Sequence, residues 1–310
     1  MEVVMNKLIS RLLTEGTIIT DGAWGTELMK RGLKKGEFPE FWNIEHPEKV
    51  EDIPRQYIAA GSRIVLTNTF GANRFILEKH KLADKVREIN EAGVKISKKA
   101  AGDKACVFAS MGPSGKMIIM KQVSADELED AFTVQAEAIA NAGADAIVVE
   151  TMMDIAEAQA AIKAAKKTGL PVVACMVFDA GKEKDRTMMG NTPEEVVQKL
   201  TAAGADVIGS NCGKGIEGFI PICRRMRAAT DLPLWMKANA GMPKVIKGET
   251  VYDTTPDQFA QFVPELIAAG ANFIGGCCGT NPDFISAIKG KTISTHPARR
   301  TSRMTRPTGD

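Results

Sequence analysis

The segment Ala271-Asn272-Phe273-Ile274-Gly275-Gly276-Cys277-Cys278-Gly279-Thr280 shows the pattern on which the whole chain is built. A short apolar run is followed by glycines and two adjacent thiols, and Asn281-Pro282-Asp283 then has the composition of a helix start. This pattern predicts a buried strand that leads into a turn with polar or thiol side chains. The same kind of segment precedes Cys212, in Val207-Ile208-Gly209-Ser210-Asn211-Cys212.

Similar apolar runs recur along the chain, and each is continuous rather than alternating in polarity. Continuous runs of this length are typical of parallel strands that are buried on both faces. Helix-capping patterns lie between them, such as Ser124-Ala125-Asp126-Glu127 and Thr192-Pro193-Glu194-Glu195. Ala-Gly joints, whose glycines suit left-handed helix ends, precede several of the runs. The eight runs cover residues 17–20, 63–67, 105–109, 146–149, 171–176, 206–209, 233–236 and 272–275.

Eight strand–helix units predict an α/β protein, a single-domain (β/α)8 TIM barrel over residues 17–288. A doubly wound open sheet is the alternative. We expect residues 1–16 to form an N-terminal helical extension and residues 289–310 to form a basic, disordered tail.

Composition limits the class of protein further. Hydrophobic residues make up 44% and charged residues 25%, which is the profile of a soluble globular protein. No apolar run is long enough for a membrane helix and no signal peptide is visible, so we expect a cytoplasmic protein. The net charge is +2, but residues 289–310 carry +5 (six Lys or Arg and one Asp), so residues 1–288 carry 2 − 5 = −3 and nucleic acid is not the expected partner.

Three of the six cysteines stand at predicted strand ends: Cys212, Cys277 and Cys278. Without a secretory signal, metal binding or catalysis is a better expectation than a disulfide framework. Three thiolates would fill the protein share of a catalytic zinc site that keeps one position open. This requires a turn between the adjacent cysteines, which the flanking glycines allow. The alternative is that the Cys-Cys pair only packs as two small apolar side chains at a strand end. We interpret the other three cysteines, Cys106, Cys175 and Cys223, as structural.

Two acids also stand at predicted strand ends, Asp21 and Glu150. A carboxylate at the mouth of an apolar barrel is costly unless it is paired, either with a substrate ammonium group or with a Lys or Arg of the chain. The segment Asp21-Gly22-Ala23-Trp24-Gly25-Thr26 is glycine-rich and opens a helix, so its N–H groups could receive a carboxylate. No histidine stands at a strand end, which argues against a histidine-based site.

The ordered set of motifs resembles the homocysteine S-methyltransferase family, over about residues 10–288. The resemblance implies a zinc barrel in which Cys212, Cys277 and Cys278 are the three ligands. It also implies that Asp21 and Glu150 hold the amino group of homocysteine, with Gly22, Thr26 and Asn68 in the substrate site and Asn239 near the zinc. The motifs are Asp21-Gly22 with Gly25-Thr26, Asn68-Thr69-Phe70, Gly112-Pro113-Ser114-Gly115, Glu150-Thr151, Gly209-Ser210-Asn211-Cys212 and Gly275-Gly276-Cys277-Cys278-Gly279-Thr280.

The activity that the resemblance implies is methyl transfer to the thiol of homocysteine, which gives methionine. We expect neither a cobalamin-binding nor a folate-binding module in these residues, so the donor stays open. It is a methylated corrinoid protein acting in trans, a separate folate protein, or a small molecule such as S-methylmethionine, S-adenosylmethionine or a betaine-like amine. The alternatives are a barrel that methylates another small thiol or selenol, and a subunit that only docks a corrinoid protein. Homo-oligomerisation is left open.

Overall fold

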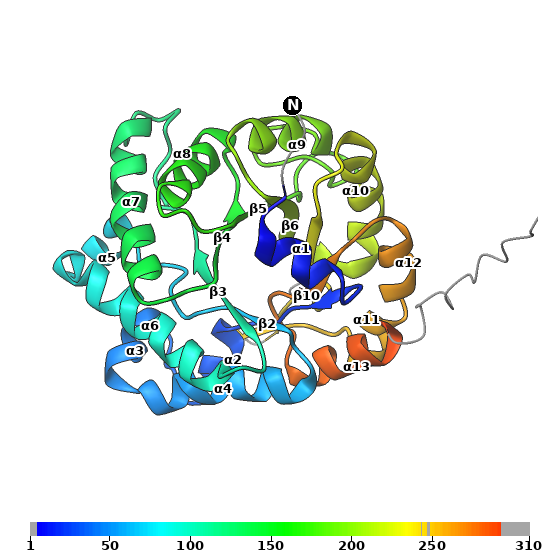
Figure 1. Cartoon of the computed structure of the whole chain (residues 1–310), viewed down its shortest axis with the longest axis horizontal. Coiled ribbons are helices and arrows are strands. Elements are labelled where there is room, and N and C mark those ends of the chain that lie inside the picture. The colour runs from blue at the N-terminus through cyan, green and yellow to red at the C-terminus, as the bar shows by residue number, and fades with distance from the viewer. Residues whose placement is uncertain (1–4, 243, 247–248, 293–310) are drawn as a thin grey trace, which may run out of the picture.

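The protein is an eight-stranded parallel barrel, as the apolar runs predict (Figure 1). The computed structural model describes residues 5–242, 244–246 and 249–292. The strands follow the order β1-β10-β7-β6-β5-β4-β3-β2, and the Arg63 N–H donates to the Ile19 carbonyl oxygen (2.8 Å) to join the last strand to the first. The open-sheet alternative is therefore excluded. The strands are β1 (Ile18–Ile19), β2 (Ile64–Val65), β3 (Cys106–Met111), β4 (Ala146–Met152), β5 (Val172–Met176), β6 (Val207–Gly215), β7 (Leu234–Asn239) and β10 (Phe273–Gly276).

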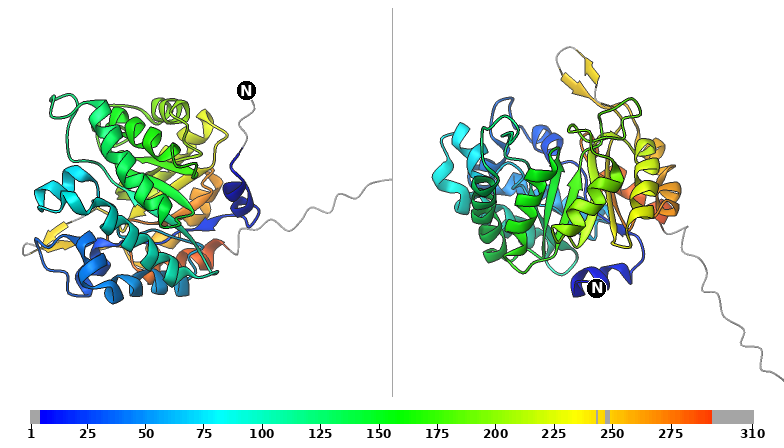
Figure 2. Two further views of the ribbon diagram at one scale, coloured as in Figure 1. Left: turned by 60° about the vertical axis from the view of Figure 1, so that its left-hand side comes forward. Right: turned by 90° about the horizontal axis from the view of Figure 1, so that it is seen from above.

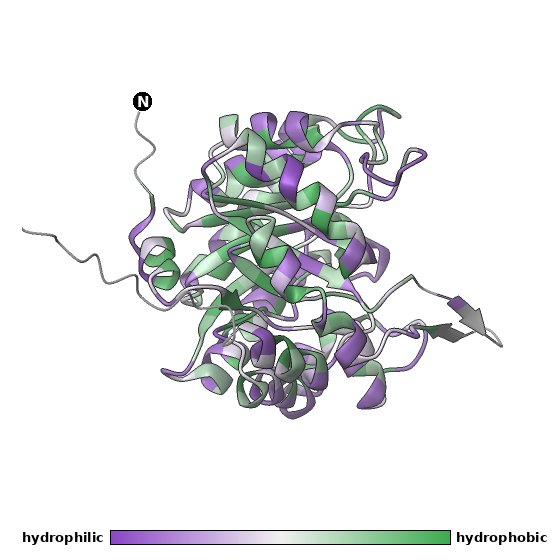
Figure 3. Cartoon of the chain, turned by 90° about the vertical axis from the view of Figure 1, so that its right-hand side faces the viewer, coloured by the Kyte–Doolittle hydropathy of each residue, from purple (hydrophilic) through white to green (hydrophobic). Residues whose placement is uncertain are grey.

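Helices surround the barrel, and several begin at the caps that the sequence predicts. Ser124, Thr192 and Thr255 each form a complete capping box. Hydropathy follows this arrangement, since the strands at the centre are mostly apolar and the outer helices carry polar faces (Figure 3). The helices are α2 (Gly25–Lys30), α3 (Trp42–Glu45), α4 (Pro47–Ala60), α5 (Arg74–Lys79), α6 (Val86–Ala101), α7 (Ala125–Asn141), α8 (Ile155–Lys166), α9 (Pro193–Ala202), α10 (Ile216–Ala229), α11 (Pro256–Ala260), α12 (Val263–Ala268) and α13 (Pro282–Thr292), with short 3₁₀ turns η1 (Pro39–Phe41) and η2 (Ala83–Lys85).

The two ends of the barrel differ. Helix α1 (Lys7–Leu13) lies across the N-terminal end and packs Ile9 and Leu12 against the interior. There Trp235 stacks on Phe108, with ring centroids 6.0 Å apart, so this end is filled by side chains. At the opposite end the hairpin of β8 (Lys244–Ile246) and β9 (Glu249–Val251) projects from the body (Figure 2). The sequence did not signal this hairpin.

The ends of the chain differ in part from the expected boundaries. Helix α13 continues to Thr292, so the first residues of the expected tail are helical. Lys289 and Lys291 lie in its last turn, where a positive charge suits the helix dipole. The rest of the expected tail, 293–310, lies outside the described residues. Within the described ranges, the helices are all too short or too polar to cross a membrane.

Candidate metal centre and substrate site

The three strand-end cysteines meet at the C-terminal end of the barrel. The sulfur atoms of Cys212, Cys277 and Cys278 all lie within 4.8 Å of one another, and the Cys212 and Cys278 sulfurs are 4.0 Å apart. Cys212 comes from β6, and the other two come from the turn after β10. Within the described ranges this is the one cluster of its kind that could hold a metal ion. The remaining cysteines, Cys106, Cys175 and Cys223, are buried in the body of the barrel.

The turn after β10 is held by close backbone contacts. The Cys277 N–H donates to the Ala238 carbonyl oxygen (2.7 Å), and the Cys278 N–H donates to Oδ1 of Asn239 (3.1 Å). Gly279 has a φ of +81°, which reverses the chain. Gly275 is needed for a different reason, because a Cβ there would lie 1.9 Å from Oγ1 of Thr20.

Register shifts in β4 and β6 change the direction of the side chains near the site. The register shifts between Asn211 and Gly215 in β6, where Cys212 has a φ of +64°. It also shifts after Val149 in β4, where Thr151 has a φ of +60°. Both strands therefore run further than the apolar runs predicted, with a bulge at the functional residue. Bulges commonly redirect side chains beside active sites.

The donor set suits a thiophilic divalent cation. Sulfur ligands at a tetrahedral zinc ion are about 3.8 Å apart, close to the separation of Cys212 and Cys278. Hydrogen bonds from Cys277 and Cys278 lower the pKa of the Cys212 thiol to about 3. The hydrogen bond with Cys212 in turn raises the pKa of Cys278 to about 11, and that of Cys277 also rises. The protein thus stabilises one thiolate by itself, and a bound cation would be needed to stabilise all three.

Asp21 lies beside the cysteines but is fully buried and fully engaged. Its Oδ2 accepts hydrogen bonds from Nε1 of Trp24 (2.9 Å) and from the Leu66 N–H (2.7 Å). Its Oδ1 lies 2.5 Å from Nζ of Lys237, and both side chains are buried. Burial lowers the pKa of Lys237, but the charges of Asp21 and Glu150 more than compensate, so the net shift is upward. Asp21 therefore has a cationic partner within the chain.

The hydrogen bonds that the Glu150 carboxylate accepts from described residues come only from neutral groups. Its Oε1 accepts from the Ser110 hydroxyl (2.5 Å), and its Oε2 accepts from the Asn211 amide (3.3 Å). The same amide nitrogen donates to Oγ1 of Thr151 (2.7 Å) and lies 3.8 Å from the Cys277 sulfur. Burial raises the pKa of Glu150, although the Lys237 charge and the Ser110 hydrogen bond oppose the shift. Asn211 thus links the acid to the thiols.

The other expected site residues differ in whether their polar groups already have hydrogen-bond partners. The Asn68 amide is already occupied, since it donates to the Pro39 carbonyl oxygen (2.7 Å) and to Oδ1 of Asn43 (3.0 Å). Gly22 packs so closely that a Cβ would lie 2.7 Å from Oγ1 of Thr280. The Thr26 hydroxyl is buried without a hydrogen-bond partner among the described residues. The structure brings Glu150 and Asn239 next to the thiols, through Asn211 and through the Cys278 N–H respectively, and the Asp21 carbonyl oxygen accepts the N–H of Gly276, which precedes Cys277 (3.0 Å).

Sequence reasoning gave no role to three polar residues of the centre: Lys237, Ser110 and Asn211, the last of which it had placed at a strand end. A signal existed for each. Lys237 is a charged residue directly after an apolar run, Ser110 belongs to a strand that continues past its apolar run, and Asn211 immediately precedes Cys212.

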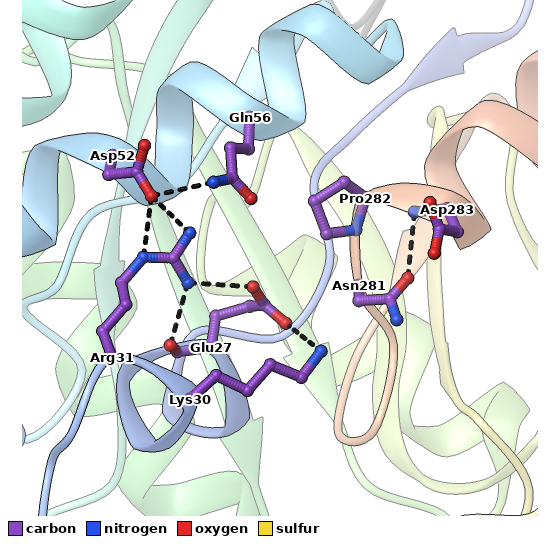
Figure 4. A pocket seen from close by; sticks show the side chains of 8 residues that line it. All are labelled: Glu27, Lys30, Arg31, Asp52, Gln56, Asn281, Pro282 and Asp283. Carbon is purple, nitrogen blue, oxygen red and sulfur yellow. Dashed lines mark hydrogen bonds and ion pairs between the residues drawn. The ribbon is translucent and has the colours of Figure 1, made fainter.

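A separate pocket of about 420 Å³ lies between α2, α4 and the start of α13 (Figure 4). Most of its charged groups pair with one another, since Arg31 pairs with Glu27 (3.0 Å) and Asp52 (2.6 Å), and Lys30 also pairs with Glu27 (2.7 Å). We assign this pocket no function.

The fold and the centre together define a (β/α)8 barrel with a three-cysteine site at its catalytic end. The chain belongs to the homocysteine S-methyltransferase family, whose model matches residues 18–292. This confirms the family suggested by the motifs, a family of methyltransferases.

Similar proteins and a similar crystal structure are consistent with this family. The chain is 30% identical to a methionine synthase of Mycobacterium tuberculosis over 89% of its own length, but it spans only 25% of that protein. It is 28% identical to betaine–homocysteine S-methyltransferase 1 of Danio rerio, over 91% of this chain and 74% of that one. The crystal structure of the metallated homocysteine methyltransferase MmuM from Escherichia coli superposes with a TM-score of 0.76 at 23% identity, covering 92% of this chain and all of MmuM. This last likeness shows the fold.

Proposed function

We propose that the protein transfers a methyl group to the thiol of homocysteine and so forms methionine, with a zinc ion held by Cys212, Cys277 and Cys278. The observation that carries this proposal is the convergence of three cysteine sulfurs within 4.8 Å beside a buried acid, Glu150, that forms no salt bridge with any described residue. A thiol site next to an unpaired carboxylate suits a small molecule that carries both a thiol and an ammonium group. The family match and the names of the relatives support homocysteine as that molecule.

The side chains around the thiols would bind and orient the substrate. Asp21 and Glu150 supply the negative charge that attracts the amino group, and the Asn211 amide fixes Glu150 relative to Cys277. Asn239 accepts the Cys278 N–H and so holds the turn that presents both adjacent sulfurs. Gly22, Thr26 and Asn68 are proposed to complete the wall of the substrate site.

The chemistry requires a thiolate, because a free thiol with a pKa of about 8.5 is mostly protonated at neutral pH. Zinc bound by the three cysteines would supply the positive charge that lowers the pKa of the substrate thiol. The substrate sulfur then forms a bond to the methyl carbon while the bond between that carbon and the donor breaks, and the donor leaves with the electron pair. The thiol proton passes to solvent. No histidine base is needed.

The test is methionine formation by the zinc-loaded protein under anaerobic conditions. Methylcobalamin, S-methylmethionine and glycine betaine would be offered separately with homocysteine. We expect methionine from one donor, with the activity lost in Cys277→Ala and kept in Cys106→Ala, whose thiol lies in the core away from the centre. Methylation of another thiol in preference to homocysteine would overturn the assigned acceptor. Full activity in Cys277→Ala would overturn the assigned site.

A further inference from the structure

We propose that hydrogen-bond donors around the metal centre decide which sulfur receives the methyl group: Asn211 protects Cys277 from methylation, and Tyr252 protects Cys278. This inference rests on the proposed function, because it concerns a reaction in which several thiolates share one cation. Asn211 and Tyr252 act through the cysteines, so they are positioning residues that determine specificity between sulfurs.

The cysteine sulfurs can compete with the substrate for the methyl group. A cysteine that ligates zinc does so as a thiolate, and a thiolate is also the nucleophile in methyl transfer. In the side reaction a bond would form between the cysteine sulfur and the methyl carbon, while the bond between that carbon and the donor breaks and the donor leaves with the electron pair. The product is a neutral thioether, so the centre would lose a thiolate ligand.

A hydrogen bond donated to a thiolate reduces its reactivity. The bond stabilises the charged form and so lowers the pKa of the thiol, and the intrinsic nucleophilicity of a thiolate falls with that pKa. A hydrogen bond to a charged group changes the pKa by about one to two units, which corresponds to roughly a three- to tenfold change in rate. Donors placed at the cysteine sulfurs therefore favour transfer to the substrate sulfur.

Asn211 has an amide whose orientation is fixed by its partners. Its Oδ1 accepts the Thr151 N–H (2.7 Å), so the opposite side of the amide is the NH2 group. That group donates to Oγ1 of Thr151 (2.7 Å), and it lies 3.3 Å from Oε2 of Glu150 and 3.8 Å from the Cys277 sulfur. A flipped amide would instead turn its oxygen toward the carboxylate and the sulfur. The buried side chain thus presents a donor to Cys277.

Tyr252 occupies the corresponding place beside Cys278. A Cβ on Gly279 would lie 2.3 Å from Cγ of Tyr252, so the ring packs directly on the residue that follows Cys278. Burial, the charge of Cys278 and a hydrogen bond with its sulfur raise the pKa of the Tyr252 hydroxyl. A phenol keeps its proton at neutral pH even at its ordinary pKa of about 10. The hydroxyl is therefore the donor, and the Cys278 sulfur is the acceptor.

The hairpin of β8 and β9 brings Tyr252 to this position. Tyr252 follows β9 directly, and Lys244, the first residue of β8, forms an ion pair with Asp253. Gly241 lies close to Thr254, because a Cβ on that glycine would be 2.4 Å from the threonine Oγ1. The base of the projecting hairpin is thereby closed next to the residue that reaches the cysteine turn (Figure 2).

The third sulfur of the centre has donors as well. The Gly213 N–H and the Asn239 side chain both hydrogen-bond with the Cys212 sulfur. Oδ1 of Asn239 accepts the Cys278 N–H (3.1 Å), so the NH2 group of this amide is the part that donates. All three cysteine sulfurs are therefore hydrogen-bond acceptors.

The experiment measures how fast methyl iodide methylates each cysteine of the zinc-loaded protein without homocysteine. After a timed reaction and digestion, mass spectrometry of fragments that separate Cys277 from Cys278 gives the rate at each position. Tyr252→Phe keeps the ring against the turn and removes only the hydroxyl. We expect it to accelerate methylation of Cys278 roughly three- to tenfold, with zinc retained and the rates at Cys277 and Cys212 unchanged.

Two controls separate reactivity from access. Tyr57→Phe removes a buried hydroxyl that donates to the Ala23 carbonyl oxygen (2.6 Å), and it should leave all three rates unchanged. In the cobalt-substituted protein, loss of the hydrogen bond in Tyr252→Phe should move the sulfur-to-metal charge-transfer absorption to lower energy. Better access of methyl iodide alone would leave that absorption where it is, and would overturn the inference.

Asn211→Leu provides the second variant. It removes the donor next to Cys277 and should accelerate methylation there but not at Cys278. An equal rise at all three sulfurs, or no rise in either variant, would overturn the inference. Loss of zinc from both variants would overturn it too, because the two residues would then hold the metal rather than change the reactivity of its sulfurs. If the wild-type protein binds no zinc, the proposed function fails; if it methylates homocysteine while Tyr252→Phe leaves Cys278 unchanged, only the inference fails.

Discussion

Nζ of Lys237 lies 2.5 Å from Oδ1 of Asp21 inside the barrel, although 216 positions separate the two residues in the sequence. The pair is enclosed on all sides, so neither charge can be satisfied by water if its partner is removed. A buried ion pair of this kind holds the structure in one arrangement, and loss of one member exposes the other to an apolar surrounding.

Replacing Lys237 alone should therefore destabilise the protein strongly. We expect Lys237→Met to lower the free energy of unfolding by about 3–5 kcal/mol, because it leaves the Asp21 carboxylate buried and unpaired. Adding Asp21→Asn should recover most of that loss. Denaturant unfolding of the single and double variants at equal zinc occupancy checks this. A Lys237→Met protein as stable as the wild type would contradict the role given to the pair.

The cysteines of the centre should behave differently from the cysteines of the core. We expect Cys212→Ala, Cys277→Ala and Cys278→Ala each to lose bound zinc. Each should also reduce methyl transfer by more than about 100-fold. Loss of a residue that only hydrogen-bonds to a metal ligand typically costs about 10–100-fold, and loss of the ligand itself should cost more. Metal analysis and the methionine assay measure the two effects. Cys106→Ala is the matched control and should keep about one zinc per chain; the same zinc content in all four variants would refute the assignment.

Asn239 should affect metal binding through the backbone of Cys278. Its Oδ1 accepts the Cys278 N–H, so Asn239→Ala removes the restraint on the cysteine turn. We expect zinc affinity to fall about 10–100-fold while the fold is kept. Competition with a coloured chelator gives the affinity. Asn141→Ala, on the exposed end of α7, is the control and should have no effect.

Glu40 should make stability depend on pH. Its Oε1 accepts from the Gly71 N–H (2.5 Å), Oε2 has no partner among the described residues, and burial raises its pKa to about 7. Between the ordinary glutamate pKa and about 7, the folded state therefore holds a proton that the unfolded state has lost. Stability from this group falls as the pH rises through that window, by about 3 kcal/mol in total.

The Glu40→Gln variant tests this directly, since glutamine stays neutral. Its free energy of unfolding should change less than that of the wild type as the pH rises from about 5 to about 8. Glu48→Gln, at the exposed start of α4, is the control and should follow the wild-type curve. Parallel curves for wild type and Glu40→Gln would show that Glu40 does not titrate in this range.

Much of the fold could be predicted because the information is local. Continuous apolar runs, the capping box at Ser124 and the glycine C-caps each depend on a few neighbouring residues. The meeting of Cys212 with Cys277 and Cys278 also followed, because the C-terminal ends of barrel strands share one face. The projecting hairpin of β8 and β9 did not, because its short strands carry no sustained alternation of polarity.

The partners within the centre could not be predicted, because they depend on register and on side-chain direction. Sequence reasoning left Asp21 open to either a substrate ammonium group or a residue of the chain, and the pairing with Lys237 needs the parallel register between β7 and β10, where Lys237 lies opposite Gly275. The bulges at Cys212 and Thr151 are likewise accompanied by hydrogen bonds between Asn211 and Thr151, which join strands far apart in sequence. No local pattern encodes them.

The most direct test of the central claim is the number of protons released when homocysteine binds to the zinc-loaded protein near pH 7. Calorimetry in buffers of different ionisation enthalpy measures that number. If the site takes the substrate as its thiolate, binding should release about one proton, since the free thiol is mostly protonated at this pH. The zinc-free protein should bind homocysteine much more weakly. Tight binding without proton release, or equal affinity in Cys278→Ala, would contradict the account.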